Sequence, residues 1–148
     1  MFKHILIPVD GTELSGRAID TGVRFAKSVG ARITGFIAEP EFRLPTQREV
    51  ISHAAALSAA EHSQRTRSHA EAVLARIAAC ASAEAVKFDT EFVENNHTVY
   101  AITDAAKKHE CDLIVMMSHG HRGLARLLHG NATEGVLTRS NIPVLVLH

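Results

Sequence analysis

Residues 113–133, LIVMMSHGHRGLARLLHGNAT, decide the fold. The first five residues form an apolar run of strand length, which is typical of a parallel strand buried on both faces. A glycine-rich loop follows, and Asn131 directly after Gly130 is a good N-cap for a helix over Ala132–Thr138. Because a helix that begins at Gly-Asn presents unpaired backbone N–H groups, we expect a small anion such as phosphate to bind at this loop.

The same alternation of apolar runs and helical periodicity extends along the whole chain. Strands are predicted over Ile5–Val9, Ile33–Ala38, Val86–Val93, Leu113–Met117 and Ile142–Leu147. Helices are predicted over Leu14–Val29, Thr46–Ala81 (one long helix or two abutting ones), Thr98–His109 and Ala132–Thr138. Strands that alternate with helices form parallel sheets through right-handed crossovers. We therefore predict a Rossmann-like α/β three-layer sandwich whose five-stranded parallel sheet has the strand order 3-2-1-4-5.

Asp10 follows the first predicted strand, at the sheet edge where the glycine loop also lies. Ligands of such sheets bind beyond the carboxyl ends of the strands, where the winding reverses, so the order 3-2-1-4-5 would bring Asp10 and the loop together. Asp10-Gly11 could also be simply a strand-ending turn, which is the commonest use of Asp-Gly, and this alternative stays open.

Composition limits the classes of function. The 148 residues suit one domain over 1–148, the formal net charge is zero, and there is no Trp; these features argue against nucleic-acid binding. Cys80 and Cys111 lack CxxC spacing, and no apolar stretch reaches the length of a membrane span or of a signal peptide. We expect a cytoplasmic protein with no disulfide framework and no membrane partner.

The histidines do not form a convincing metal site. The loop residues His119, His121 and His129 are not joined by Cys, Asp or Glu at ligand spacing, so we interpret them as solvent-exposed. His62 and His69 share a helix face but lie two turns apart, too far to bind one ion, and are expected to be solvated. No metal site is predicted.

The sequence shows no catalytic motif. It contains neither a GxSxG elbow nor a GxxxxGK[ST] loop, and Ser118 and His119 are adjacent in the chain, so their side chains point to opposite faces of a strand. We expect a protein that is not an enzyme, with at most slow, incidental ATP hydrolysis.

Three segments carry a resemblance to a known family: KHILIPVDGTELSGRAI (3–19), CDLIVMMSHGHRGLARLLHGNATEGVL (111–137) and SNIPVLVLH (140–148). Together they resemble the universal stress protein family from end to end. Its ATP-binding members carry the pattern G-x2-G-x9-G-[ST], which Gly120 and Gly130 fit. Met117 stands at the first glycine position and Asn131 at the hydroxyl position.

The resemblance implies a nucleotide site. Pro8, Val9 and Asp10 would line the adenine end, with Ile37 packed on the ring. Residues 117–120 would follow the ribose and α-phosphate, residues 130–133 would receive the β- and γ-phosphates, and Arg122 or Arg126 could supply positive potential. The candidate nucleotide-binding residues are Pro8, Val9, Asp10, Ile37, Met117, His119, Gly120, Arg122, Gly130, Asn131, Ala132 and Thr133.

The expected function is therefore a stress-response or signalling module that binds ATP or another adenine nucleotide, with or without Mg²⁺. The resemblance also implies a homodimer paired through Ile142–Leu147, and pairing would cover an apolar edge strand; a monomer with a locally protected edge is the alternative. A second function stays open: a member that has lost the nucleotide and acts only in dimerisation and interaction, with Met117 and Asn131 marking the lost site.

Overall fold

The computed structural model describes residues 1–44, 46–47, 58–118 and 132–148. The helices and strands in chain order are β1 (His4–Pro8), α1 (Glu13–Val29), β2 (Arg32–Glu39), α3 (Ala59–Ala83), β3 (Phe88–Glu94), α4 (Thr98–Lys108), β4 (Leu113–Met117), α5 (Ala132–Arg139) and β5 (Val144–Leu147).

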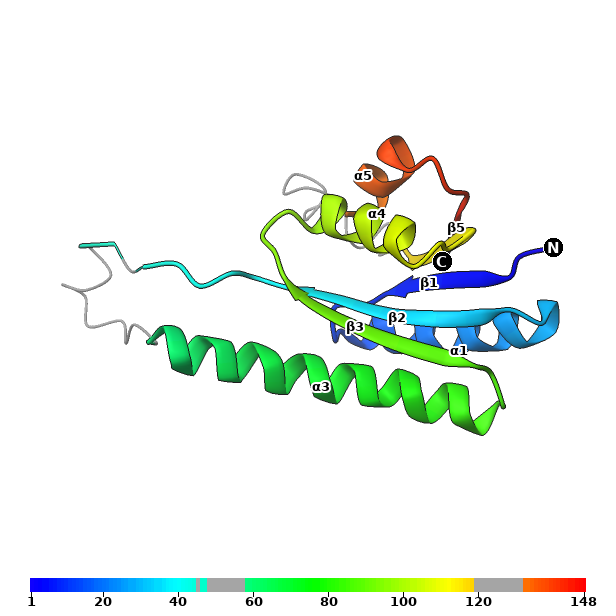
Figure 1. Cartoon of the computed structure of the whole chain (residues 1–148), viewed down its shortest axis with the longest axis horizontal. Helices are drawn as coiled ribbons and strands as arrows, with labels where there is room; N and C mark the ends of the chain where they lie inside the picture. The colour runs from blue at the N-terminus through cyan, green and yellow to red at the C-terminus, as the bar shows by residue number, and fades with distance from the viewer. Residues whose placement is uncertain (45, 48–57, 119–131) are drawn as a thin grey trace.

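The five strands form one parallel sheet in the order β3-β2-β1-β4-β5. Helices α1 and α3 cover one face, and α4 and α5 cover the other (Figure 1). The core is accordingly divided in two: one buried cluster contains Ile5, Ile7 and Ile77 under α1 and α3, and the other contains Leu6 and Phe36 under α4 and α5. The predicted three-layer fold and strand order are confirmed.

Helix α1 has clear signals at both ends. The Thr12 side chain accepts a hydrogen bond from Ser15 N at the start, and Gly30 adopts a left-handed conformation (φ 69°) at the end. Both are ordinary capping solutions for backbone groups that a helix leaves without partners. The observed helix therefore starts one residue before the predicted Leu14 and ends at Val29 as expected.

Helix α3 begins with a capping box in which Ser58 and Glu61 bond each other's backbone N–H groups. Its buried side chains recur at three to four residues, as an amphipathic helix requires: Thr66, Ala70, Leu74, Ile77 and Ala81. Of the helix predicted over Thr46–Ala81, the structure shows Ala59–Ala83, and Gln47 is also helical. Residues 48–57 lie outside the described part of the chain.

Strand β3 corrects one sequence-based expectation. The alternation over Val86–Val93 predicts that Val86, Phe88, Thr90 and Phe92 share the better-buried face. Phe88 is nevertheless 37% exposed, whereas the Glu91 side chain is only 14% exposed. The reason is that β3 is an edge strand, and Lys108 and His109 reach from α4 to hold Glu91 inward. Among the described residues, no helix is both long and apolar enough to cross a membrane.

Candidate functional site

Toward the carboxyl edge of the sheet, the pairing of β1 with β4 ends at an earlier residue of β1 than its pairing with β2 does. The β1–β2 ladder has five Cα pairs, from His4 to Pro8, but the β1–β4 ladder has only two, at Ile5 and Leu6. This is the position where the order of winding reverses, and ligands of open α/β sheets bind there.

Pro8 explains the early end of the β1–β4 ladder. Backbone groups of a strand alternate between its two neighbours. His4 O accepts from Asp112 N on the β4 side, whereas Val9 N donates to Phe36 O on the β2 side. Pro8 therefore faces β4, where it has no N–H to donate.

The turn after β1 is held by hydrogen bonds to the start of α1. Asp10 Oδ1 accepts from Thr12 N (3.0 Å), Thr12 Oγ1 (2.7 Å) and Ser15 Oγ. Ser15 Oγ also accepts from Asp10 N at 3.0 Å. The strand-ending turn considered as an alternative for Asp10-Gly11 is thus present, and it fixes the orientation of the Asp10 carboxylate.

Helix α3 holds the same turn from the other side. Gly11 has φ +80°, and a Cβ placed on it would lie 2.6 Å from His69 Nε2 and 3.0 Å from Val73 Cγ2. His69 Nδ1 also pairs with Glu39 Oε1 at the end of β2. His69 therefore bridges the ends of two neighbouring strands.

His69 is exposed, as expected, and His62 is half-buried, but both side chains also make contacts at the carboxyl end of β2. The His62 Nε2 group lies 2.8 Å from Pro40 O, and His69 contacts Glu39. Sequence reasoning also missed Glu39 as a partner. The sequence did contain a signal for these contacts. At helical spacing, His62, His69 and Val73 lie beside the row of buried α3 residues that includes Thr66.

On the other side of the edge, α5 is fastened to the end of β4. The Thr133 hydroxyl lies 3.4 Å from Met117 O, as a donor, and Ser118 N donates to Leu147 O at 2.8 Å. The first turn of α5 thus lies against the carboxyl end of β4.

The predicted site residues fall into three groups. Pro8, Met117 and Ala132 are half-buried and Asp10 is exposed, all at the carboxyl edge. Val9 is 8%, Ile37 1% and Thr133 7% exposed, so the Ile37 side chain packs in the core under α1 and α3 rather than at an open surface. The remaining residues lie outside the described part of the chain: His119, Gly120, Arg122, Gly130 and Asn131.

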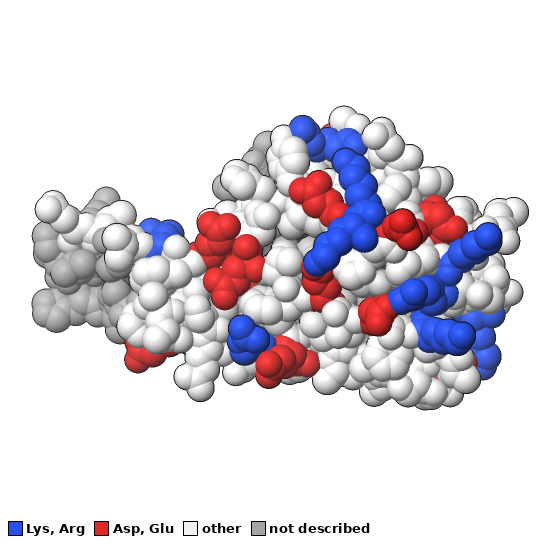
Figure 2. Space-filling view, viewed as in Figure 1, with Lys and Arg blue, Asp and Glu red and all other residues white. Residues whose placement is uncertain are grey.

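Charge is unevenly distributed along the sheet. On the face shown in Figure 2, Lys and Arg lie over α4 and α5 and toward the end where the strands begin, and a group of Asp and Glu lies near the carboxyl end of β2. The exposed carboxylates there include Glu41 and Glu94, which follow β2 and end β3. An anionic group is therefore disfavoured on the β2–β3 side of the edge.

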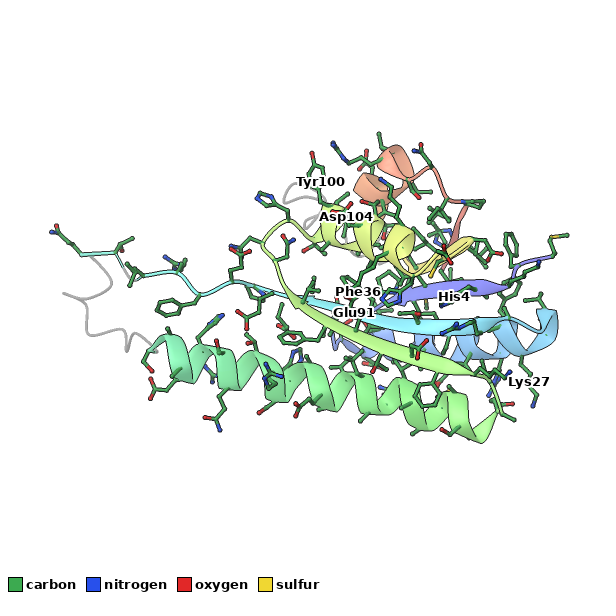
Figure 3. All side chains as sticks on the ribbon, viewed as in Figure 1. His4, Lys27, Phe36, Glu91, Tyr100 and Asp104 are labelled. Carbon is green, nitrogen blue, oxygen red and sulfur yellow. The ribbon has the colours of Figure 1, made fainter. Side chains whose placement is uncertain are left out.

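A second polar cluster lies between the sheet and α4 (Figure 3). His4 Nε2 lies 2.7 Å from Thr34 Oγ1, and burial, together with the charge of Arg32, lowers the pKa of His4. Burial acts to raise the pKa of Glu91, but hydrogen bonds from Lys108 and His109 outweigh it and lower the pKa. Within the described residues, no group of three or more His, Cys, Asp or Glu side chains is placed to hold a metal ion.

Known proteins resemble this chain over its whole length. The sequence profile described as the Universal stress protein family matches residues 1–148. A universal stress protein of Methanocaldococcus jannaschii is 29% identical over 152 residues, which cover 99% of this chain and 82% of that protein.

Three solved structures are similar in fold. The hypothetical protein MJ0577 has a TM-score of 0.76 and 25% identity, covering 99% of this chain and 96% of that one. A universal stress protein in complex with cAMP has a TM-score of 0.68 and 20% identity, with coverage of 99% and 97%. A universal stress protein from Archaeoglobus fulgidus in complex with dAMP has a TM-score of 0.59 and 13% identity, with coverage of 100% and 98%.

Proposed function

Because this chain belongs to the universal stress protein family, we propose that it binds an adenine nucleotide at the carboxyl ends of β1 and β4 and acts as a binding module rather than as an enzyme. The observation that carries the proposal is the early end of the β1–β4 ladder at Pro8, beside a fixed Asp10 turn. Two proteins of the same fold are solved with cAMP and dAMP, which supports an adenine nucleotide as the ligand.

The charge distribution favours one orientation of the nucleotide. Glu41 and Glu94 lie on the β2–β3 side of the edge, where phosphates would be repelled. The start of α5 lies on the β4 side, where the dipole of the helix attracts anions. We therefore place the base near Pro8 and Asp10, and the phosphates toward residues 130–133.

The described half of the site supports binding more than catalysis. Oδ1 of Asp10 already accepts three hydrogen bonds, and the Thr133 hydroxyl interacts with a backbone carbonyl. In this arrangement, the Asp10 carboxylate and the Thr133 hydroxyl stabilise the local fold. Mg²⁺ would enter with the phosphates of ATP, whose charge it neutralises.

Titration of the purified protein with ATP, ADP, AMP and cAMP, with and without Mg²⁺, tests the proposal by calorimetry. We expect binding of at least one nucleotide, abolished in Gly130→Leu and retained in Ala79→Leu, which adds the same side chain at an exposed position of α3. An absence of heat and of thermal shift at millimolar ligand would refute nucleotide binding.

A second function is favoured by two departures from the family pattern. Met117 replaces a glycine, and Asn131 replaces the hydroxyl residue of the G-[ST] step. In this alternative the chain no longer binds a nucleotide and serves in dimerisation and interaction. It predicts that protein denatured directly after purification releases no nucleotide, and that Gly130→Leu leaves the stress phenotype of the cell unchanged.

We also propose that the protein forms a homodimer through β5. Ile114 N donates to Pro143 O and Ser118 N donates to Leu147 O, so the alternating backbone groups of Val146 point away from β4, toward the sheet edge. Val146→Pro removes the outward N–H and should halve the mass measured by light scattering, whereas Val146→Thr should keep the dimer. A wild-type monomer would refute the pairing.

A further inference from the structure

We infer that His69 of α3 is a positioning residue for the nucleotide site, because it holds the Asp10-Gly11 turn against the end of β2. This inference rests on the proposed function. The nucleotide contacts assigned above come from the strand ends and the start of α5, and no contact had been assigned to α3.

The first observation is the closeness of the His69 ring to Gly11. The space that a Cβ on Gly11 would need is filled by the ring, with Nε2 at 2.6 Å and Cε1 at 3.0 Å from the ideal Cβ position. Val73, one turn further along α3, fills the other side with Cγ2 at 3.0 Å. The turn is thus packed directly against α3, and glycine is required both by this contact and by its positive φ.

The second observation is the pair between His69 Nδ1 and Glu39 Oε1. The Glu39 side chain is 12% exposed, and its backbone O accepts from Asn95 N at 2.8 Å, so Glu39 is a fixed anchor. The His69 side chain is 48% exposed and would otherwise be free to rotate. The carboxylate therefore sets the ring in the rotamer that meets Gly11.

These contacts have a consequence for Asp10. The α1 side holds the Asp10 carboxylate through Thr12 and Ser15, and the α3 side holds the adjacent Gly11. A turn fixed from two sides needs no ordering when the ligand binds, and such preorganisation increases affinity. Without His69, the turn would keep its α1 contacts and, from α3, only the contact with Val73.

The test measures nucleotide affinity in three variants and one control. We expect His69→Ala to weaken the binding of cAMP or ATP about fivefold, which corresponds to about 1 kcal/mol, and Glu39→Ala, which removes the acceptor for His69 Nδ1, to weaken it by a similar factor. His69→Gln, whose amide can still donate to Glu39, should restore most of the affinity. His62→Ala removes the same kind of side chain two turns earlier, where the partner is Pro40 O, and should bind as the wild type does.

A second readout separates positioning from general destabilisation. In ¹H–¹⁵N spectra recorded well below the melting temperature, His69→Ala should shift the Gly11 and Asp10 amides and leave those of α5 unchanged. If His69→Ala does not fold, Glu39→Ala decides the question, because it leaves the His69 ring in place and removes the acceptor that orients it.

The outcomes are distinguishable. If the wild type binds nucleotide and His69→Ala binds it equally well with an unshifted Gly11 amide, the positioning role is wrong and the proposed function stands. If the wild type binds none of the nucleotides, the proposed function fails, and the role of His69 in it fails too.

Discussion

Gly35 offers the sharpest test of how α3 is held on the sheet, and therefore of what places His69. A Cβ on Gly35 would lie 2.6 Å from Ile77 Cδ1 and 3.0 Å from Ile77 Cγ2, whereas carbon atoms in contact are separated by about 3.5–4.0 Å. Ile77 has no exposed surface, so its side chain is surrounded by packed residues and has no free space to move into. Gly35→Ala therefore forces α3 outward or Ile77 out of its rotamer.

The expected cost follows from similar overpacking in other cores. We expect Gly35→Ala to lower the free energy of unfolding by about 2 kcal/mol, and Ile77→Val alone by about 1 kcal/mol. Valine lacks the Cδ1 atom that lies closest to the added methyl group. The double variant should therefore lose about 2 kcal/mol rather than the additive total of about 3 kcal/mol.

The measurement is urea unfolding followed by far-UV circular dichroism, since the chain has no Trp. The denaturation midpoint should fall while the slope stays constant. Gly30→Ala is the control, because nothing lies within 4 Å of its Cβ position and only its φ of +69° is unfavourable; its cost of about 1 kcal/mol should add to that of Ile77→Val. Strict additivity of Gly35→Ala with Ile77→Val would refute the close contact.

Three further predictions concern titration, thiol access and helix capping. The pKa of His4 is lowered in the folded state, so the unfolded chain binds more protons than the folded chain. His4 therefore makes the free energy of unfolding fall as the pH drops below about 6.5, by at most about 1.4 kcal/mol per pH unit, until the folded-state pKa is reached. Unfolding curves between pH 5 and 8 should show this fall in the wild type, and an equal fall in His4→Gln would contradict the prediction. Burial raises the pKa of Cys111 to about 12. Mass spectrometry after iodoacetamide treatment of the folded protein at pH 8 should therefore find the half-exposed Cys80 modified before Cys111. Equal rates of modification of the two thiols would show that Cys111 is accessible to the reagent. Ser58→Ala removes the cap on Glu61 N and should cost about 1 kcal/mol in unfolding, while Ser58→Asp should be close to neutral; a loss in both variants would point to another role for Ser58.

The sequence was sufficient for the sheet because its main determinants are local. Apolar runs of strand length and glycine or threonine caps, such as Thr12 and Gly30, act within a few residues, and the right-handed crossover rule limits how the strands can be ordered. The strand order and the strand-ending turn at Asp10 were therefore predictable. The face of β3 was not, because its burial depends on being an edge strand and on side chains from α4.

The contacts around the candidate site were less predictable for a physical reason. His69 and Glu39 are separated by thirty residues, and their pairing depends on the rotation of α3 about its axis. Periodicity identifies the buried row of a helix, but residues that flank the row, such as His69, can face either solvent or a neighbouring strand. Which of these two directions a flanking residue faces is decided by how the helix packs on the sheet.

The position of α3 then connects the core to the site. Ile77 fixes the helix on β2 through its contact with Gly35, and His69 lies eight residues, or slightly more than two turns, toward its N-terminus. An outward shift of α3 at Ile77 would carry His69 away from Gly11. Gly35→Ala should therefore weaken nucleotide binding as His69→Ala does, although Gly35 lies in the core and contacts no ligand, and Ile77→Val should restore the affinity together with the stability. Recovery of stability without recovery of affinity would show that α3 and the Asp10 turn are not mechanically linked.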